Sequence, residues 1–455
     1  MVSAASAPAA PSAIPEAALE QGDGGLYRWY VVAVMFVGYC FSAIDARVLT
    51  LMVGPIKQDL GLSDFEISLL QGFAFSILYS LAAIPIGRYV DSSSNRARLI
   101  VFGVLFWSAM TMACGMARSF LALFLTRVGV GVGEATLSPT AYSLISDYFE
   151  RNRRALAISL YAIGYPVGSG LALIVGAALL HHFNGQGGAT LGPLGHHQPW
   201  QMVFITVGLP GVLVALLIST IREPRRRELA AGYKGAMPLA EVARYVGQRW
   251  RLYGMLIGSL SLIALLSIGT TLWYPTFLIR SYGMTEGEVG LYFGLVMLIF
   301  GTIGTIFGGW LSGRLMRLGQ QDANMRIVLV ATILKGLPLV IGPLMPSAPL
   351  ALAMMAVGTL VGQASQGVML SALQDVTPNQ LRGQVTALSL LAVNLVGMGL
   401  GASVIAAITD FGFGDENALR YSIAISGAVV LPLIVIVIMT GMGAYRRALD
   451  EMRGR

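Results

Sequence analysis

Charged side chains are scarce in this chain, since Asp, Glu, Lys and Arg make up only 12% of its 455 residues. Soluble proteins carry about 25%, so a water-soluble fold is excluded. Cysteine is also scarce: Cys40 and Cys114 both fall within apolar runs, and no disulfide framework is expected. The sequence lacks a phosphate-binding loop, a zinc motif and a nucleophile elbow. We therefore predict that the protein is not an enzyme and does not use ATP.

Histidine is limited to two pairs, His181 with His182 and His196 with His197, which flank a glycine-rich segment. No acidic residue or cysteine stands beside them, as a metal site would require. We expect solvated loop residues and no metal site.

Long apolar runs, by contrast, are abundant. The hydrophobic share is 55% and the mean hydropathy is +0.71. The runs extend for about 20 residues, as membrane-crossing helices require, and do not alternate over about 10 residues as barrel strands do. We predict an all-α membrane protein with twelve transmembrane helices, near residues 29–53, 67–88, 98–117, 120–145, 154–182, 201–221, 252–279, 289–313, 326–345, 348–372, 383–409 and 419–443.

Internal repeats divide these spans into two groups of six. Asp147 and Arg154 follow the fourth span with the same spacing as Asp375 and Arg382 after the tenth. Two pseudo-symmetric six-helix bundles around a central loop are typical of secondary transporters. The expected domains are a disordered tail at 1–25, an N-terminal bundle at 26–222, a cytoplasmic linker at 223–251, a C-terminal bundle at 252–445 and a cytoplasmic tail at 446–455.

Lysine and arginine positions predict the orientation. If the N-terminus is cytoplasmic, most of the 30 basic residues lie in inner segments, and the outer segments hold only Lys57, Arg118, Arg280 and Arg420. The positive-inside rule then places both termini in the cytoplasm. The net charge of +7 needs no nucleic acid, because these residues face anionic lipids. The excess of Arg over Lys favours a bacterial inner membrane, and we expect a monomer.

Three motifs resemble those of the major facilitator superfamily. Gly87, Asp91 and Arg96 with Arg98 resemble its loop signature, Arg127 within RVGVGVGEA resembles its fourth-helix motif, and GYPVGSG resembles its fifth-helix motif. More narrowly, AIDARVLTLMVGPIKQDLGLSD and YPVGSGLALIVG are similar to the Spinster branch. The resemblance implies the two-bundle fold and, because animal Spinster proteins carry sphingosine phosphate or lysophospholipids, a lipid substrate.

Two positions depart from the Spinster pattern. Its members commonly place an arginine directly after the first-helix aspartate, but here Ala46 follows Asp45 and the nearest base is Arg47. A step of two residues turns a helical side chain by about 200°, so Arg47 does not share the face of Asp45. Ser92 also stands where a basic residue is expected after Asp91. The family's headgroup contact therefore does not carry over with Asp45.

Asp45 is the most costly residue of the first span, because an acid near the centre of a membrane helix costs roughly 2.5 to 3.5 kcal/mol. Span one runs outward and span four inward, so Asp45 and Arg127 lie at similar depths and could pair. Glu134 follows Arg127 two turns later on the same face. A guanidinium that moves between two carboxylates changes their proton affinity, which predicts proton coupling by these three residues. The alternative is a fixed ion pair that stabilises the N-terminal bundle.

Polar side chains within the spans are the candidate substrate ligands: Arg47, Arg127, Glu134, Gln363, Gln366 and Asn394. Arg47 could instead extend to the outer surface, and the three amides could bond between helices. Soft apolar residues that could line the same cavity are Phe293, Met297, Phe300, Phe307, Met369 and Met398. A cavity that is polar on one side and apolar on the other would suit an amphiphile, although such residues also pack in ordinary cores.

Charged residues at the inner helix ends are predicted to form a cytoplasmic gate or to fix those helix ends: Asp91, Arg96, Arg98, Asp147, Arg151, Arg154, Asp375 and Arg382. Near the outer end of span seven, Trp273, Tyr274 and Pro275 are predicted to form an extracellular gate, with an aromatic belt as the alternative.

These features together predict a proton-coupled secondary active transporter that works by alternating access. Its expected substrate is an amphiphilic lipid such as a lysophospholipid or a sphingosine-like lipid. A carrier of a small organic anion, or a drug exporter, is the alternative. The proton gradient is the expected driving force, with no cofactor, and membrane lipids are the other expected partners.

Overall fold

The computed structural model describes residues 25–92, 95–192, 195–224, 239–378 and 381–453. Within these ranges, 12 helical spans are long and apolar enough to cross a membrane. The protein is therefore a multi-pass membrane protein, and the prediction of an all-α fold with twelve spans is confirmed. Two short strands, β1 (Ala189–Thr190) and β2 (His196–His197), pair antiparallel in the loop after the fifth span.

The N-terminal half contains the first six spans. Its apolar runs fold as helices because, within a bilayer, every backbone group must be hydrogen-bonded inside the protein. Its helical elements are α1 (Gly25–Val48), η2 (Leu49–Leu51), α2 (Val53–Leu60), α3 (Asp64–Ser68), η3 (Leu69–Phe73), α4 (Ala74–Ser92), α5 (Arg96–Cys114), α6 (Phe120–Glu134), α7 (Leu137–Tyr148), α8 (Arg151–Gln186), α9 (Pro199–Gly208) and α10 (Gly211–Ser219).

The C-terminal half contains the other six spans and begins with the amphipathic α11. Its elements are α11 (Leu239–Gln248), α12 (Trp250–Tyr282), α13 (Glu286–Arg317), α14 (Ala323–Ile341), η5 (Gly342–Leu344), α15 (Ala348–Asp375), α16 (Arg382–Ala392), η6 (Val393–Gly399), α17 (Leu400–Ala407), η7 (Ile408–Phe413), η8 (Glu416–Ala418) and α18 (Leu419–Arg453). Of the η segments, η3, η6 and η7 are π-helical and the others are 3₁₀ turns.

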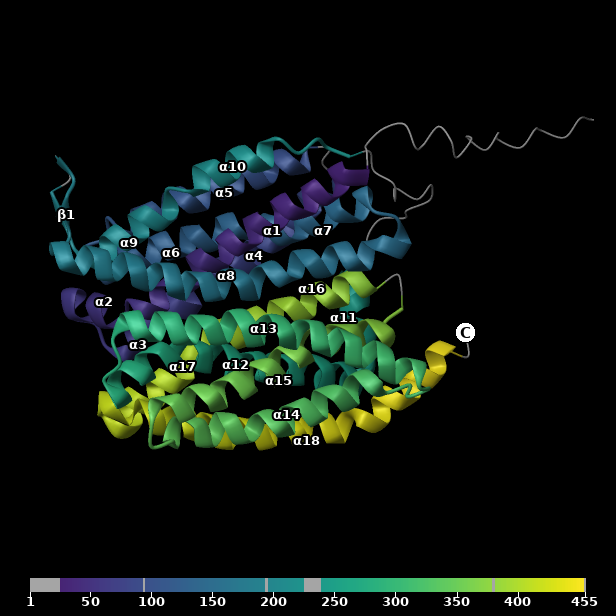
Figure 1. The fold of residues 1–455 in the computed structure, drawn as a ribbon. Helices are drawn as coiled ribbons and strands as arrows, with labels where there is room; N and C mark the ends of the chain where they lie inside the picture. Colours follow the sequence, from purple (N-terminus) through teal and green to yellow (C-terminus); the bar gives the residue numbers. More distant parts are fainter. Residues whose placement is uncertain (1–24, 93–94, 193–194, 225–238, 379–380, 454–455) are drawn as a thin grey trace, which may run out of the picture.

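The two halves lie side by side with their long helices roughly aligned, as Figure 1 shows. One end of the molecule, here called the terminal end, holds the start of α1 and the C-terminus. The opposite end, here called the far end, holds β1, α2 and α3. The expected domain boundaries stay a prediction, and residues 1–24 of the expected tail and 225–238 of the expected linker lie outside the described part.

The apolar core shows where the halves are joined. One cluster of buried residues runs through the N-terminal half and continues into the C-terminal half, where it includes Phe277, Phe293 and Ile405. A second cluster, which includes Leu252 and Tyr445, lies within the C-terminal half alone. The members of this cluster in the C-terminal half lie toward the far end, so the halves pack against each other there.

Close helix contacts across the two halves depend on glycine. A Cβ atom added to Gly170 of α8 would lie 2.7 Å from the Gly294 carbonyl oxygen of α13. One added to Gly72 in the π-turn η3 would lie 2.2 Å from the Met398 carbonyl oxygen in the π-turn η6. Small residues allow membrane helices to approach closely and pack. The absence of side chains at these positions thus allows direct backbone packing between the halves.

Candidate transport site

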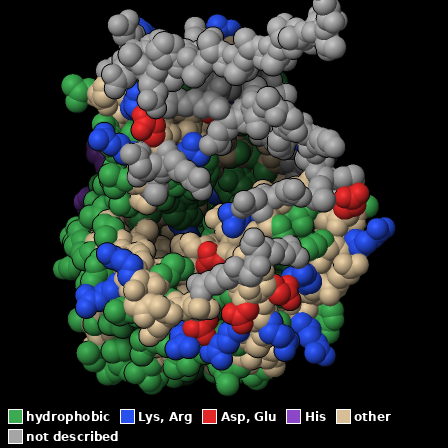
Figure 2. All heavy atoms as spheres, turned by 90° about the vertical axis from the view of Figure 1, so that its right-hand side faces the viewer, with side chains coloured by type: hydrophobic (Ala, Val, Ile, Leu, Met, Phe, Trp, Pro, Cys, Tyr) green, Lys and Arg blue, Asp and Glu red, His purple; other side chains and the backbone are tan. Residues whose placement is uncertain are grey.

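A cavity of about 380 Å³ lies between the two halves. Its N-terminal wall comes from α1, η2 and α8, and its C-terminal wall from α12, α13, α14, α15, α16 and η6. Figure 2, which faces the terminal end, shows a hollow between the halves with apolar walls. The cavity therefore lies where a rocking motion of one half against the other would expose it alternately to each side of the membrane.

Four of the six predicted substrate ligands line this cavity: Arg47, Gln363, Gln366 and Asn394. Arg47 extends into it from the N-terminal half and does not reach the outer surface. The three amides come from α15 and η6 in the C-terminal half. Their substrate-binding role stays a prediction, but the structure gathers them in one place.

Apolar residues make up much of the C-terminal wall. Phe293, Met297 and Met369 line the cavity as proposed from the sequence. Phe300, Phe307 and Met398 do not, so their expected placement is wrong. Phe307 is 44% exposed but is not among the residues that line the cavity.

Arg127 and Glu134, the other two predicted substrate ligands, are buried inside the N-terminal bundle with Asp45 and do not line the cavity. Arg127 donates a hydrogen bond from Nη1 to the main-chain carbonyl of Asp45 at 3.2 Å. The Asp45 carboxylate faces Trp107 and Thr111 of α5, and neither of its oxygens accepts a hydrogen bond of normal geometry within the described chain. The two side chains therefore form no direct ion pair in this conformation, and Arg127 bonds the backbone of α1 instead.

Glu134 lies beside these residues on α6. One of its carboxylate oxygens accepts a hydrogen bond from Ser42 Oγ on α1 at 2.6 Å, and the other has no partner among the described residues. Arg127 and Asp45 both act on Glu134 electrostatically. One arginine thus lies near two carboxyl groups in the buried interior of the bundle, as expected from the two-turn spacing on α6.

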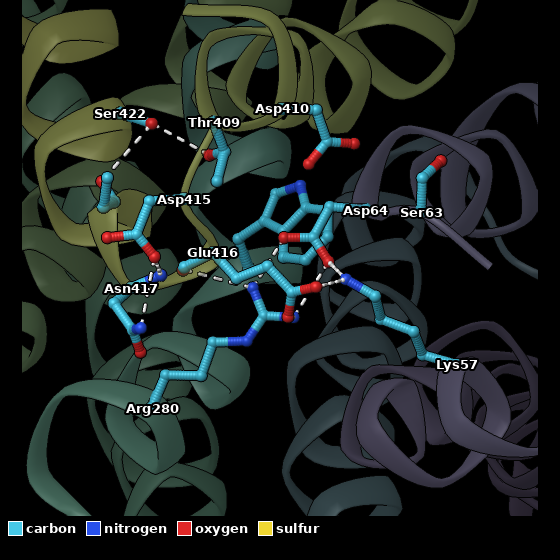
Figure 3. A network of polar contacts seen from close by, with 12 residues as sticks. Lys57, Ser63, Asp64, Arg280, Thr409, Asp410, Asp415, Glu416, Asn417 and Ser422 are labelled. Carbon is cyan, nitrogen blue, oxygen red and sulfur yellow. Dashed lines mark hydrogen bonds and ion pairs between the residues drawn. The ribbon is translucent and has the colours of Figure 1, made fainter. Parts of the chain in front are cut away.

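The far end is closed by ion pairs between the halves (Figure 3). Asp64 of α3 is fully buried and accepts two bonds from Arg280 of α12, at 2.6 and 2.8 Å. Lys57 of α2 also bonds Asp64, at 2.7 Å, and pairs with Glu416 of η8. Glu416 also pairs with Arg280 at 3.2 Å. These four residues, here called the far-end network, join the two halves.

The predicted extracellular gate residues lie inside the C-terminal bundle. Trp273 donates from Nε1 to the Ala402 carbonyl at 2.9 Å, and the Tyr274 hydroxyl donates to the Ala351 carbonyl at 2.7 Å. Pro275 is buried beside them in α12. An aromatic belt toward lipid is therefore wrong for these residues, and Tyr274 lines the transport cavity.

At the terminal end, the Arg96 contacts stay within the N-terminal half. Arg96 bonds Asp147 and Glu223, each at 2.6 Å, and Ser143 at 2.7 Å. The exposed Arg98 lies two residues further along, in the same first turn of α5. In this conformation Arg96 therefore fixes the ends of α5 and α7 and does not join the two halves.

The matching contacts of the C-terminal half are also local. Asn324 donates to Asp375 at 2.8 Å, and Arg382 donates to the carbonyls of Gln374 and Thr377, both at 3.0 Å. Arg154 also interacts with another group, but its predicted gating role is not tested by that contact. The side chains of Asp91 and Arg151 lie outside the described part, and the gating role of this whole set stays a prediction.

A family model of the Major Facilitator Superfamily matches residues 35–402, which is most of the chain. The protein belongs to the major facilitator superfamily. A solved relative supports this: a crystal structure of a bacterial homolog to the human lysosomal transporter Spinster, in an inward-facing and unoccupied conformation, has a TM-score of 0.72 and 27% identity, and the match covers 95% of this chain and 99% of that one.

The chain is also similar to three relatives whose names describe different kinds of protein. An MFS-type efflux pump of Mycolicibacterium smegmatis is 29% identical over 70% of this chain and 70% of its own length. Protein spinster of Drosophila melanogaster is 25% identical over 68% of this chain and 49% of its own length. A probable L-galactonate transporter of Escherichia coli is 24% identical over 70% of this chain and 69% of its own length. The superfamily and the Spinster-like resemblance are thus confirmed, and the protein is a transporter, not an enzyme.

Sequence reasoning missed two features of this superfamily member. Lys335 lines the cavity, and its position inside the predicted span 326–345 was the signal that could have marked it as a site residue. The far-end network joins Lys57 and Asp64 to residues more than 200 positions later, such as Arg280 at a separation of 216 from Asp64. The only signal was that Lys57 and Arg280 are among the few basic residues predicted outside.

One histidine also differs from its expected environment. His197 is only 2% exposed, and its Nδ1 lies 3.2 Å from the Gly115 carbonyl oxygen. His181, His182 and His196 are exposed, as expected. Strand β2 places His197 against the end of α5, so the expectation of a solvated residue is wrong there. No group of three or more His, Cys, Asp or Glu within the described ranges could hold a metal ion.

Proposed function

We propose that this major facilitator protein is a proton-coupled transporter that carries an amphiphilic lipid by alternating access. One observation carries the proposal: a cavity between the halves, polar on one side and apolar on the other, lies beside a buried bundle interior that holds two carboxyl groups and one arginine. The cavity would bind the substrate, and the carboxyl groups would bind protons.

Alternating access requires that one end opens as the other closes. The far-end network joins the halves at one end, and the hollow in Figure 2 lies at the other. The basic residues predicted to be cytoplasmic, such as Arg222 and Arg249, lie at the terminal end. We therefore place the terminal end and both termini in the cytoplasm of a bacterial cell, with the protein in the inner membrane, so this conformation faces inward.

Helix α1 would couple the proton site to the substrate site. Asp45 faces the interior of the N-terminal bundle, while Arg47, two positions later, extends into the cavity. Arg127 holds the backbone of α1 at Asp45. A change in the protonation of Asp45 or Glu134 would alter the position of Arg127 and, through α1, the position of Arg47. The other titratable groups that face this site are the Cys114 thiol and the Tyr79 hydroxyl.

An amphiphile is favoured over a purely polar solute because four methionines and one phenylalanine are among the described residues of the C-terminal wall. Flexible thioether side chains adapt to acyl chains of different shape. The likeness to Spinster proteins supports the same proposal. A carrier of a small organic anion, or a drug exporter, is the second candidate, which the probable L-galactonate transporter and the efflux pump support.

Transport by the purified protein in liposomes tests this function directly. We expect uptake of a labelled lysophospholipid to depend on a proton gradient, whereas uptake of labelled galactonate under the same conditions would favour the second candidate. No gradient-dependent flux of any amphiphile would contradict the proposal.

Two variants of the carboxyl groups test the coupling. We expect Asp45→Asn and Glu134→Gln to abolish the stimulation of flux by a pH gradient while the protein still folds, because neither amide can exchange a proton. The exposed Asp450→Asn at the terminal end is the matched control and should retain stimulation. Full gradient-driven flux at every pH in either buried variant would show that these groups do not couple transport to protons.

A further inference from the structure

The charges of the transport cavity are of one sign. Arg47 and Lys335 are the only ionisable Asp, Glu, Lys or Arg side chains among the described lining residues. Arg47 belongs to α1 in the N-terminal half, and Lys335 belongs to α14 in the C-terminal half. The cavity thus presents two cations, one from each half, and no carboxylate that would neutralise them.

Arg47 has unused hydrogen-bonding capacity. Its Nη2 donates to the Tyr165 hydroxyl at 3.2 Å, and the guanidinium lies over the Tyr165 ring at 5.8 Å. Its Nε and Nη1 are buried and have no acceptor within the described chain. Buried donors without partners are costly, so a bound acceptor would be stabilised here. A guanidinium offers two parallel donors to a phosphate or a carboxylate.

Lys335 is held in a neutral environment. It lies near the middle of α14, its Nζ donates to Ser267 Oγ, and no described carboxylate forms an ion pair with it. The facing helix α15 has glycine at position 362, where an added Cβ would lie 3.0 Å from Nζ. The glycine therefore leaves the space that the ammonium group occupies. A cation in such a place is expensive unless an anion pairs with it.

We propose that Arg47 and Lys335 together bind the anionic headgroup, a phosphate monoester or a carboxylate, of a single-chain amphiphile whose tail contacts the apolar wall near Phe293 and Met369. This inference rests on the proposed function and narrows its substrate class. A sphingosine-like base carries a positive headgroup, which these two cations would repel. The preferred substrate is therefore the anion, and Lys335 is a specificity-determining residue in the C-terminal half.

An anion in this position has a mechanical consequence. Because its two partners come from opposite halves, the headgroup would form ion pairs with both halves at once. Substrate binding would then favour a conformation in which the halves approach each other around the cavity. This provides differential binding between conformations, which any ligand-driven change requires.

Binding to the purified protein in detergent tests the charge preference with four probes whose hydrocarbon chains have the same number of carbons. They are oleoyl-lysophosphatidate with a phosphate monoester, oleate with a carboxylate, monoolein with a neutral headgroup and sphingosine with a cationic one. We expect both anions to bind more tightly than monoolein and sphingosine. The ratio of the two anions distinguishes a phosphate from a carboxylate site, and the absence of binding by inorganic phosphate would show that the tail is needed.

Variants at position 335 test the assigned residue. We expect Lys335→Gln to weaken oleoyl-lysophosphatidate binding by about tenfold or more, because a charge-assisted hydrogen bond is lost, while monoolein binding changes little. Lys335→Arg should retain most of the affinity, and Gly362→Ala should weaken it without removing a charge. Arg314 on α13 is exposed, so Arg314→Gln is the matched control. It should change the binding of neither oleoyl-lysophosphatidate nor monoolein.

Two results would overturn the inference. One is sphingosine binding as tight as oleoyl-lysophosphatidate, and the other is an unchanged anion affinity in both Lys335→Gln and Gly362→Ala. Gradient-driven flux of a neutral or cationic amphiphile in either case would leave the proposed function intact. Absence of flux for all four probes would instead contradict the proposed function itself.

Discussion

Arg96 is the residue whose contacts define the terminal end of the N-terminal half. Its side chain is 1% exposed, and it joins the start of α5 to Asp147 at the end of α7 and to Glu223 after α10. Three segments that are distant in sequence thus meet at one guanidinium. Such a group is expected to stabilise the bundle because its loss removes the ion pairs that it makes with Asp147 and Glu223.

We predict that Arg96→Met lowers the free energy of unfolding by about 3 kcal/mol, the usual cost of removing one partner from a buried ion pair. Thermal unfolding of the purified protein in detergent provides the measurement. Arg98→Met is the matched control, because Arg98 lies in the same helical turn but is exposed, and it should change stability little. Equal stability of the two variants would show that the buried contacts contribute nothing.

Single residues also show how far the sequence predicts the site. The cost of Asp45 in a membrane span and the two-turn spacing of Arg127 and Glu134 were sufficient to gather these three residues. They were not sufficient to show that Arg127 would bond the Asp45 carbonyl in place of its carboxylate. Lys335 was not found, because the space for it comes from Gly362 on another helix. Helical periodicity predicts which face a side chain takes but not what faces it.

At the scale of the elements, Asp322 joins the start of α14 to α18 at the terminal end. Its carboxylate accepts bonds from Arg326 at 2.6 Å and from Arg446 at 2.7 Å. Burial alone would raise the pKa of Asp322, but the two guanidinium groups outweigh burial and hold the pKa below its ordinary value. A lowered pKa means that the contribution to stability is present at neutral pH and is lost as the pH falls through the folded-state pKa.

We predict that the wild-type protein loses up to about 1 kcal/mol more stability than Asp322→Asn when the pH is lowered from 7 to about 3, a small effect because both arginines are half-exposed. Unfolding temperatures of the two proteins across this range provide the measurement. Their difference should shrink below about pH 4, where an ordinary aspartate protonates. If the stability difference between the two proteins grows toward low pH, the pKa of Asp322 is not lowered in the folded protein.

The π-turns are elements that the sequence did not predict. Spans two and eleven were both expected as regular helices, but η3 and η6 each insert an extra residue in a turn and pack against each other across the halves. The apolar pattern of a membrane helix sets its length and ends and gives no information on such local widening. Single π-turns are frequent at functional sites, which fits their place at the moving interface.

Gly72 provides a test of this contact. An added methyl group would lie 2.2 Å from the Met398 carbonyl oxygen, which cannot rotate away. We therefore predict that Gly72→Ala disfavours the conformation with a closed far end and raises the labelling rate of a cysteine introduced at Ser403, which is buried in this conformation and bonds Ser68 across the halves. Gly258→Ala in α12, where no atom lies within 4 Å of the added group, is the matched control. Unchanged labelling in Gly72→Ala would mean that the π-turns do not control this end.

The molecule as a whole is held together differently at its two ends. At the far end, the apolar core is continuous and four charged residues join the halves. Toward the terminal end, the C-terminal half has a core of its own, and Arg96 bonds within its own half. The repeats in the sequence predicted two halves, but not which end would be closed. That depends on partners far apart in the chain.

The far-end network predicts how the equilibrium between a closed and an open far end can be shifted. Asp64→Asn removes the carboxylate that two cations share, so we expect the population with an open far end to rise by about tenfold or more. Distances between spin labels on α2 and η8 should then include a longer component. Glu66→Gln is the matched control, because Glu66 lies on the same helix but bonds only Ser63 within its capping box.

The single variant Arg280→Gln and the double variant Asp64→Asn with Arg280→Gln complete a double-mutant cycle. We expect the double variant to open the far end little more than either single variant, because the Asp64–Arg280 ion pair is lost in all three. If the distances in Asp64→Asn match those of the wild type, the network does not hold the far end closed. The apolar contacts across η3 and η6 would then be sufficient by themselves.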